Sequence, residues 1–132
     1  MQITDYIGTK WEADGVGPGS FNCWTMVRHY YKHVLGVELP EQVVDVNCIK
    51  AVTKLAQSES ENLSVWEELE TPVEGAIVLM GTGRTMGHVG VIATRDLQVL
   101  HCSHSAGRSN LQSLHKIRQQ WRNVKFYKLR CT

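Results

Sequence analysis

The sequence predicts one α+β domain, in which N-terminal helices pack on a small antiparallel sheet. In the first half of the chain, apolar residues recur at helical spacing. In the second half, short continuous apolar runs are typical of buried strands. The length of 132 residues is enough for one hydrophobic core and too short for two. We therefore expect a single domain over residues 1–132.

Two helices are expected in the first half. A helix is predicted over residues 21–35, because its apolar residues lie on one stripe. Ser20 or Asn22 can cap its start, and Gly36 ends it. A second apolar stripe predicts a helix over residues 40–57.

Shorter elements connect and precede these helices. Residues 1–12 are interpreted as a lead-in with a helical beginning. The Gly15–Gly19 loop turns the backbone sharply before the helix over residues 21–35. Residues 66–69 are predicted to form a helical turn.

The second half is predicted to form an antiparallel meander. Continuous apolar runs indicate strands over residues 76–80, 88–93 and 98–102. A short helix is expected over residues 111–120, and a closing strand over residues 124–129.

A formal net charge of +1 conceals an asymmetry along the chain. Residues 1–83 contain 5 Lys and Arg against 12 Asp and Glu, whereas residues 84–132 contain 9 against 1. The basic part could contact nucleic acid or another anionic polymer, or the two halves could neutralise each other by packing together. The sequence contains no nucleic-acid-binding motif, and no apolar run reaches the roughly 18 residues of a membrane span. We therefore expect neither a nucleic-acid partner nor a membrane.

The N-terminus and the cysteines indicate the compartment. Met1–Asp5 has neither the basic region nor the apolar run of a secretory signal peptide, so synthesis in a cytoplasm is expected. The four cysteines are scattered without C-x-x-C spacing. In a reducing compartment this pattern favours thiols over a disulfide framework.

Cys23 is the strongest candidate for a reactive group. It lies at the start of the predicted helix, where the helix dipole lowers the pKa of a thiol and backbone N–H groups can hold an oxyanion. His88 opens a predicted strand, and His101 lies on the next one. A hairpin can bring the two together, so that His88 accepts the thiol proton and His101 fixes its tautomer. These residues predict a thiol hydrolase that needs no cofactor.

A zinc site is the alternative use of these residues. His101, Cys102 and His104 supply soft ligands close together in the sequence. Two further candidate ligands, Cys23 and His88, could join them. Adjacent residues of a strand point to opposite faces, however, and the sequence has no second ligand pair with familiar spacing. We therefore predict no metal site.

Several short stretches, in this order, carry a family resemblance: a lead-in with an aromatic residue and glycines over residues 8–19, the Phe21–Val27 segment around Cys23, and histidine-bearing strands over residues 75–80, 87–91 and 99–101. Together they resemble the NlpC/P60 family of papain-like cysteine peptidases, in particular members encoded by bacteriophage tail genes. The resemblance implies the papain-like NlpC/P60 fold. It also implies Cys23 as nucleophile, His88 as base and His101 as the orienting residue.

The same resemblance implies a substrate and a setting. The family's usual substrate is an amide bond in peptidoglycan stem peptides, often the γ-D-glutamyl–diaminopimelate link. Trp11 takes the place of an aromatic residue near the substrate pocket, which Asn22 and Trp24 are also expected to line. Asn22 stands where the family commonly has an acid. A tail-associated enzyme would open the cell wall locally, and other phage tail proteins would be its partners.

Two other functions remain open on this fold. The chain could be a catalytically silent structural protein of a tail tip or its assembly. It could also be a thiol acyltransferase, since water and an amine would meet the same thioester. Alkylation separates the silent protein from the other two, because a silent scaffold has no fast-reacting Cys23 near neutral pH.

Overall fold

The computed structural model describes residues 2–39, 66–82 and 87–129. Its strands are β1 (Lys10–Trp11), β2 (Ser20–Phe21), β3 (Trp66–Leu69), β4 (Ile77–Gly81), β5 (His88–Ile92), β6 (Gln98–Ser103), β7 (Arg108–Ser113) and β8 (Asn123–Leu129). Its helical elements are the 3-10 helix η1 (Ile3–Asp5), α1 (Cys23–Tyr30), the π-helix η2 (Tyr31–Leu35) and α3 (Leu114–Gln120). The strands form one eight-stranded sheet in the order β2-β1-β7-β6-β5-β4-β8-β3.

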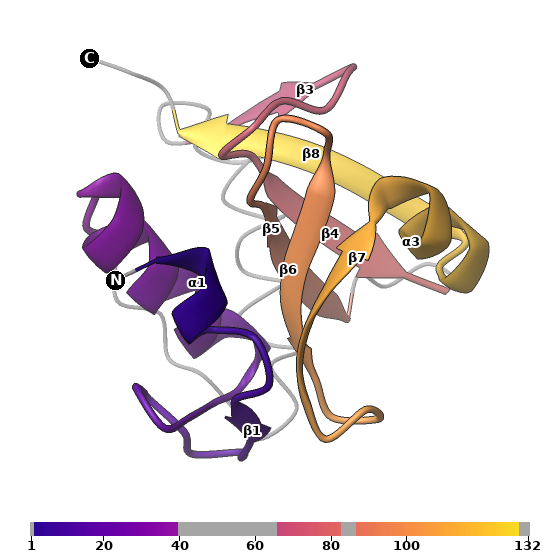
Figure 1. Ribbon diagram of the computed structural model, residues 1–132. Helices are drawn as coiled ribbons and strands as arrows, with labels where there is room; N and C mark the ends of the chain where they lie inside the picture. Colours follow the sequence, from indigo (N-terminus) through magenta and orange to yellow (C-terminus); the bar gives the residue numbers. More distant parts are fainter. Residues whose placement is uncertain (1, 40–65, 83–86, 130–132) are drawn as a thin grey trace.

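Two apolar clusters cover the two faces of the sheet, because successive strand residues point to opposite sides. On one face, α1 packs against alternate residues of the central strands, among them Val89, Val91, Leu100 and Cys102. On the other face, α3 packs against the intervening residues, among them Val78, Met80, Ile92 and Val99. Figure 1 shows α1 and α3 on opposite sides of the sheet. The central strands β4 and β5 are buried along their whole length, which explains their continuous apolar runs.

The start of α1 is fixed by a reciprocal cap. Asn22 Oδ1 accepts the N–H of Thr25 at 2.9 Å, and Thr25 Oγ1 accepts the N–H of Asn22 at 2.9 Å. Cys23 is therefore the first residue of the helix, two residues after the predicted start, because Phe21 belongs to β2 and Asn22 is the cap. The helix continues through η2 to Gly36, whose left-handed backbone (φ +72°) ends it at the predicted residue.

The sheet is larger than predicted and is mixed, so the prediction of a small antiparallel sheet is wrong in part. β1 pairs with β2 in parallel, with Lys10 opposite Ser20. The intervening loop returns close to itself at Gly15, where a Cβ would lie 2.7 Å from the backbone nitrogen of Phe21. The lead-in begins with η1, in agreement with the expected helical beginning, and a loop this tight lets its last residues form β1 and pair with β2.

Residues 66–69 form strand β3 and not the predicted helical turn. The four residues pair antiparallel with β8 along its outer edge. Glu68 accepts a hydrogen bond from the Tyr127 hydroxyl at 3.4 Å, and Leu69 packs on the cluster under α3. Pairing with an existing strand edge outweighs the local preference of so short a segment.

The predicted helix over residues 111–120 is divided between two elements. Its first residues belong to β7, which pairs with β6 along its whole length. The helix α3 begins at Leu114, after Ser113 accepts the N–H of Lys116 at 3.2 Å. The residues of β7 are mostly polar, so the sequence has no alternation of apolar and polar residues that would indicate a strand. The strand forms through its main-chain pairing with β6.

The other predictions of secondary structure have clear outcomes. The strands predicted over residues 76–80, 88–93, 98–102 and 124–129 are confirmed as β4, β5, β6 and β8. The helix predicted over residues 40–57 lies outside the described residues. Among the described helices, none has the length and apolar character needed to cross a bilayer.

β5 and β6 leave no room for a side chain at Gly90. It lies opposite His101 in the ladder, and a Cβ there would be 2.9 Å from the Leu100 carbonyl oxygen and 3.0 Å from His101 Cβ. A backbone oxygen cannot move aside cheaply. The absence of a side chain at Gly90 therefore allows His101 to lie against β5.

Gly90→Ala is expected to lower the free energy of unfolding by about 1–3 kcal/mol, because the added methyl group overpacks this contact. Urea unfolding followed by tryptophan fluorescence measures the change. Gly19→Ala is the matched control, since nothing lies within 4 Å of a Cβ at Gly19. Equal stability of the two variants would contradict the packing explanation.

Candidate active site

A cavity of about 240 Å³ opens where β5 begins and β6 ends. Residues from both sides of the sheet line it: Cys23 at the start of α1, Gly87 and His88 at the start of β5, Ser103, His104 and Ser105 at the end of β6, Trp11 from β1, and Trp121 after α3. The structure thus brings Cys23 and His88 to one cavity. Both side chains are buried, with Cys23 3% exposed and His88 7% exposed.

His88 and His101 form a buried pair. His88 Nε2 lies 2.8 Å from His101 Nδ1, within hydrogen-bond distance, and the rings meet edge to face. The bond uses one ring nitrogen of His88, so Nδ1 is the nitrogen left for chemistry with a thiol. The predicted pairing of the two histidines is confirmed as geometry.

The other ring nitrogen of His101 is also hydrogen-bonded. His101 Nε2 lies 2.7 Å from Gln112 Oε1 of β7. His88, His101 and Gln112 therefore form a chain of hydrogen bonds across β5, β6 and β7. His101 itself is 4% exposed and does not line the cavity.

Burial keeps both histidines neutral. It lowers the pKa of His88 well below the ordinary 6.5, and the neighbouring His101 lowers it further. Burial also lowers the pKa of His101, while the hydrogen bond to Gln112 opposes that shift. A neutral imidazole beside a thiol can accept a proton, which is the protonation state that a general base needs.

Two tryptophans line the cavity. The Trp121 ring stacks on His88 with centroids 5.4 Å apart and planes 16° apart. Trp11 packs on the ring of His104 at 4.3 Å. Both are half-buried, so each presents part of its ring to the cavity. The predicted location of Trp11 beside a pocket agrees with this arrangement.

Asn22 and Trp24 lie away from the cavity. Asn22 caps α1, and its Nδ2 donates to the Ala13 carbonyl oxygen at 3.0 Å. Trp24 is completely buried in the cluster under α1, and its indole N–H has no hydrogen-bond partner among the described residues. Helix capping and core packing explain the two residues, which were predicted to line the pocket. Because Asn22 both donates and accepts, an acid at this position would lose the bond to Ala13.

The zinc alternative finds no support in the geometry. Cys102 points into the α1 side of the sheet and its thiol donates to the Phe21 carbonyl oxygen at 3.5 Å. His101 points to the other side, as strand alternation requires. Within the described residues, no group of three His, Cys, Asp or Glu side chains could hold a metal ion.

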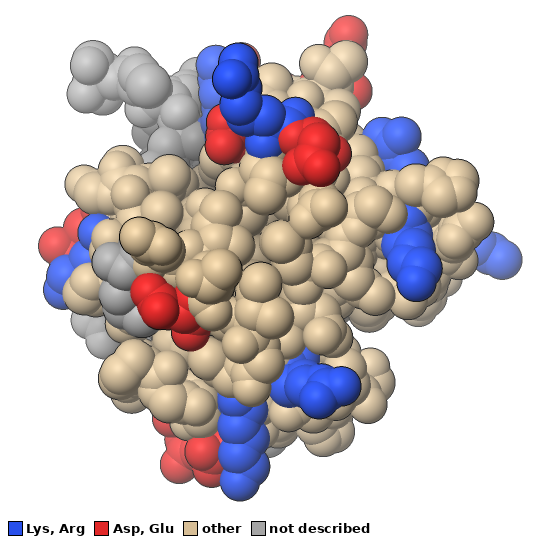
Figure 2. Space-filling model, in the orientation of Figure 1, with Lys and Arg blue, Asp and Glu red and all other residues tan. Residues whose placement is uncertain are grey.

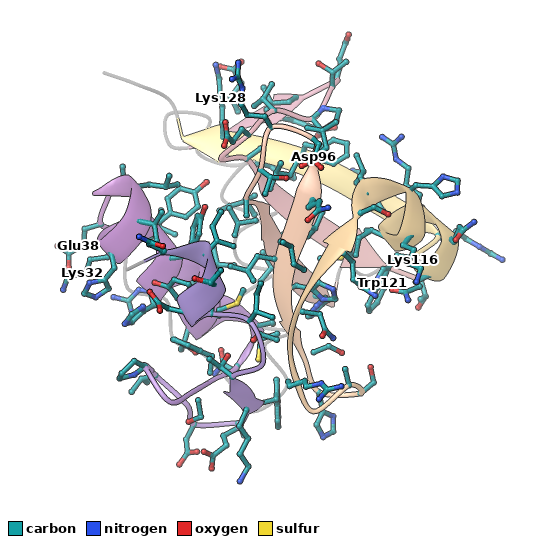
Figure 3. All side chains as sticks on the ribbon, in the orientation of Figure 1. Lys32, Glu38, Asp96, Lys116, Trp121 and Lys128 are labelled. Atoms are coloured by element: carbon teal, nitrogen blue, oxygen red, sulfur yellow. The ribbon has the colours of Figure 1, made fainter. Side chains whose placement is uncertain are left out.

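A second hollow, of about 180 Å³, lies along α1 and η2. Arg28, His29, Lys32, His33 and Glu38 are among its lining residues. Two of them, Lys32 and Glu38, are labelled in Figure 3. None of the lining residues of this hollow lines the Cys23 cavity, so it is separate from the candidate site.

The basic residues of the C-terminal part do not form a band on the face drawn in Figure 2. In the described part of that face, Lys and Arg side chains lie at separate places around the rim, and the centre is largely uncharged.

Sequence reasoning missed two residues of the site. Trp121 lies just beyond the helix predicted over residues 111–120, and Gln112 lies within it. No sequence signal marks either one, because their contacts with His88 and His101 arise from the fold. A strand prediction for β7 would have placed Gln112 beside β6.

The comparisons with known proteins agree on one family. The NlpC/P60 family profile matches residues 8–127. The structure is similar to the NlpC/p60 domain of the peptidoglycan hydrolase SagA, with a TM-score of 0.59 and 18% identity, covering 94% of this chain and 89% of that one.

Two structures from Trichomonas vaginalis are similar as well. NlpC1 matches with a TM-score of 0.60 and 16% identity, and NlpC2 with 0.60 and 15%. Each match covers 96% of this chain, but only 38% of NlpC1 and 41% of NlpC2. No curated protein matches the chain. At these identities the structural likeness shows the fold.

The neutral histidines make stability depend on pH. Their folded-state pKa values lie below the ordinary 6.5, so below that pH the unfolded chain binds more protons than the folded chain. The stability that they contribute is present above about pH 6.5 and is lost as the pH falls toward the folded-state values. We expect the urea midpoint of the wild type to fall between pH 7 and pH 5.

The double variant His88→Gln/His101→Gln should show a smaller fall over the same range. His29, whose pKa burial also lowers, remains in both proteins and accounts for a residual fall. Falls of equal size in the two proteins would show that the buried pair does not control the acid sensitivity.

Asn22→Ala is expected to destabilise the fold by about 1–2 kcal/mol, because it removes the cap of α1. Asn22→Ser, which keeps an oxygen for the Thr25 N–H, should cost less. Thermal unfolding of the two variants checks the order. The capping role is wrong if both variants are as stable as the wild type.

Proposed function

We propose, since the chain belongs to the NlpC/P60 family, that it is a cysteine peptidase that hydrolyses amide bonds in bacterial peptidoglycan stem peptides. One observation carries the proposal. Cys23 and His88 line the same cavity, and His88 is hydrogen-bonded to His101 at 2.8 Å. A thiol, a neutral base and a group that orients the base are what thiol hydrolysis requires.

The first half of the proposed reaction forms a thioester. His88 Nδ1 takes the proton of the Cys23 thiol, and the thiolate attacks the carbonyl carbon of the amide bond. Backbone N–H groups at the start of α1 stabilise the oxyanion of the tetrahedral intermediate. The C–N bond then breaks as His88 returns the proton to the leaving amine.

The second half regenerates the thiol. A water molecule enters the cavity, His88 Nδ1 accepts one of its protons, and the hydroxyl attacks the thioester carbonyl carbon. When this second intermediate collapses, the C–S bond breaks and the proton returns to Cys23. His101 keeps His88 in one orientation throughout and stabilises the imidazolium that forms in each half.

We assign the γ-D-glutamyl–diaminopimelate link as the bond cleaved. The family resemblance of the Phe21–Val27 segment and the likeness to a peptidoglycan hydrolase domain support this substrate class. The walls of the cavity fit such a peptide in chemical terms. The Trp11 and Trp121 rings can pack on its aliphatic parts, whereas Ser103 and Ser105 can hydrogen-bond its amides.

We further propose that the protein acts as part of a bacteriophage tail, with other tail proteins as partners. This step rests on the similarity of the segment around Cys23 to tail-encoded members of the family. Mass spectrometry of purified virions and of the unassembled lysate fraction tests it. Finding the chain only in the unassembled fraction would contradict it.

Cys23→Ala is expected to lower the release of new amines from purified peptidoglycan by roughly three orders of magnitude or more, because no nucleophile remains. Amine labelling measures the rate, and mass spectrometry of the fragments identifies the bond. Cys102→Ala is the matched control, since it removes a buried thiol that does not line the cavity. We expect it to retain activity.

The same assay separates the other functions. If an added amine acceptor appears in the fragments in place of water, the chain is an acyltransferase. If the wild type releases no amine from walls of several chemistries and Cys23 is not alkylated rapidly near neutral pH, the hydrolase proposal is wrong and the structural role is favoured.

A further inference from the structure

We infer that Gln112 is a positioning residue that sets the tautomers of both histidines, and so makes Nδ1 of His88 the nitrogen that accepts a proton. The inference rests on the proposed function, in which that proton comes from Cys23. Gln112 does not line the cavity and touches no reacting atom. It acts through His101.

The amide oxygen of Gln112 determines which atom donates in each hydrogen bond of the chain. Gln112 Oε1 can only accept, so His101 Nε2, 2.7 Å away, must carry a hydrogen. A neutral imidazole has one N–H, so His101 Nδ1 is then an acceptor. His88 Nε2, 2.8 Å from it, must donate and therefore carries the hydrogen of its own ring. Nδ1 of His88 is left with the lone pair.

Without this acceptor the opposite arrangement becomes available. His101 could carry its hydrogen on Nδ1 and donate it to His88 Nε2. The hydrogen of His88 would then lie on Nδ1, and the ring could not accept a proton there. Both arrangements satisfy the bond between the two histidines, so that bond alone does not choose between them.

The fold holds Gln112 at the required place. In the ladder between β6 and β7, His101 pairs with Asn110 and Val99 pairs with Gln112. Gln112 therefore lies on the same face of the sheet as His101, two residues beyond Asn110 on β7. The next residue, Ser113, caps α3, which fixes the end of the strand. Gln112 is half-buried, so the strand limits the positions of its amide.

The electrostatics of the pair agree with this role. Burial lowers the pKa of His101, and the hydrogen bond that its ring N–H donates to Gln112 Oε1 raises that pKa, as an acceptor beside a ring N–H must. The titratable group that acts on His88 is His101. The neutral amide thus favours one tautomer without placing a charge beside the pair.

Histidine side-chain ¹⁵N spectra test the inference directly, because they distinguish a protonated ring nitrogen from an unprotonated one. We expect the hydrogen on Nε2 of both His88 and His101 in the wild type at pH 7. Gln112→Met removes the acceptor while keeping a similar length, and should place a hydrogen on Nδ1 in part of the His101 population. Gln112→Glu keeps an acceptor and should retain the wild-type tautomer.

Alkylation of Cys23 gives a second readout, with the modified peptide followed by mass spectrometry so that the other cysteines do not contribute. In Gln112→Met we expect the alkylation rate at pH 7 to fall about tenfold, which corresponds to the net contribution of one hydrogen bond. In Gln112→Glu the rate should stay within about threefold of the wild type. The added carboxylate should also move the acid limb of the pH profile to higher pH, since it favours protonated His101.

Asn110→Met is the matched control, because Asn110 lies on β7, as Gln112 does, and pairs with His101 of β6. It should leave the tautomers and the alkylation rate unchanged. Circular dichroism of each variant confirms that the fold is retained. Gln112→Glu provides a folded comparison even if Gln112→Met is unstable.

The outcomes separate this inference from the proposed function. Wild-type tautomers that persist in Gln112→Met, with an unchanged alkylation rate, would overturn the inference and leave the hydrolase proposal intact. If the tautomers of the histidines change in Gln112→Met, the inference is supported even if the protein does not cleave peptidoglycan. A hydrogen found on Nδ1 of His88 in the wild type would overturn both the inference and the proposed proton transfer.

Discussion

The hydrogen bond between His88 and His101 is the interaction on which the site depends. It spans two neighbouring strands, and the ladder that pairs Gly90 with His101 places the two rings at bonding distance. Gly90 lies on the same face as His88 and adds no side chain where His101 meets β5. The bond is therefore a consequence of strand register, and any slip of one residue would turn one ring to the other face.

Burial gives this pair its chemical character. Two imidazoles shielded from water are stable only if they are neutral and hydrogen-bonded. His88 bonds to His101, His101 bonds to Gln112, and Trp121 covers the first ring. The same low-dielectric surroundings that exclude a charge in the resting protein strengthen each hydrogen bond in the chain.

The cavity combines the two faces of the sheet. α1 covers one face and carries Cys23 at its capped start, whereas α3 covers the other and is followed by Trp121. Cys23 and Trp121 both line the cavity, together with Gly87 and His88 at the start of β5. The fold thus brings the N-terminus of α1 and His88 to one cavity, although the next residue of β5, Val89, points to the α1 side of the sheet.

The sequence alone determined the components of this site and the main elements that carry them. Helical spacing located the helix that starts at Cys23, and continuous apolar runs located β4, β5 and β6 with their histidines. These signals are local, since a helix stripe and a buried strand are visible within a few residues. The stretches over residues 8–19 and 21–27 and the strands that carry His88 and His101, taken in order along the chain, indicated the family.

Only the tertiary structure decided which residues meet these components. β3 forms because β8 offers an edge, and β7 forms because β6 does, although neither segment has an apolar period of its own. Gln112 reaches His101 through such a pairing, and Trp121 reaches His88 from the end of α3. Trp24, predicted beside the substrate, is in the core. A contact between residues far apart in the chain depends on register and packing, and no short window of sequence contains that information.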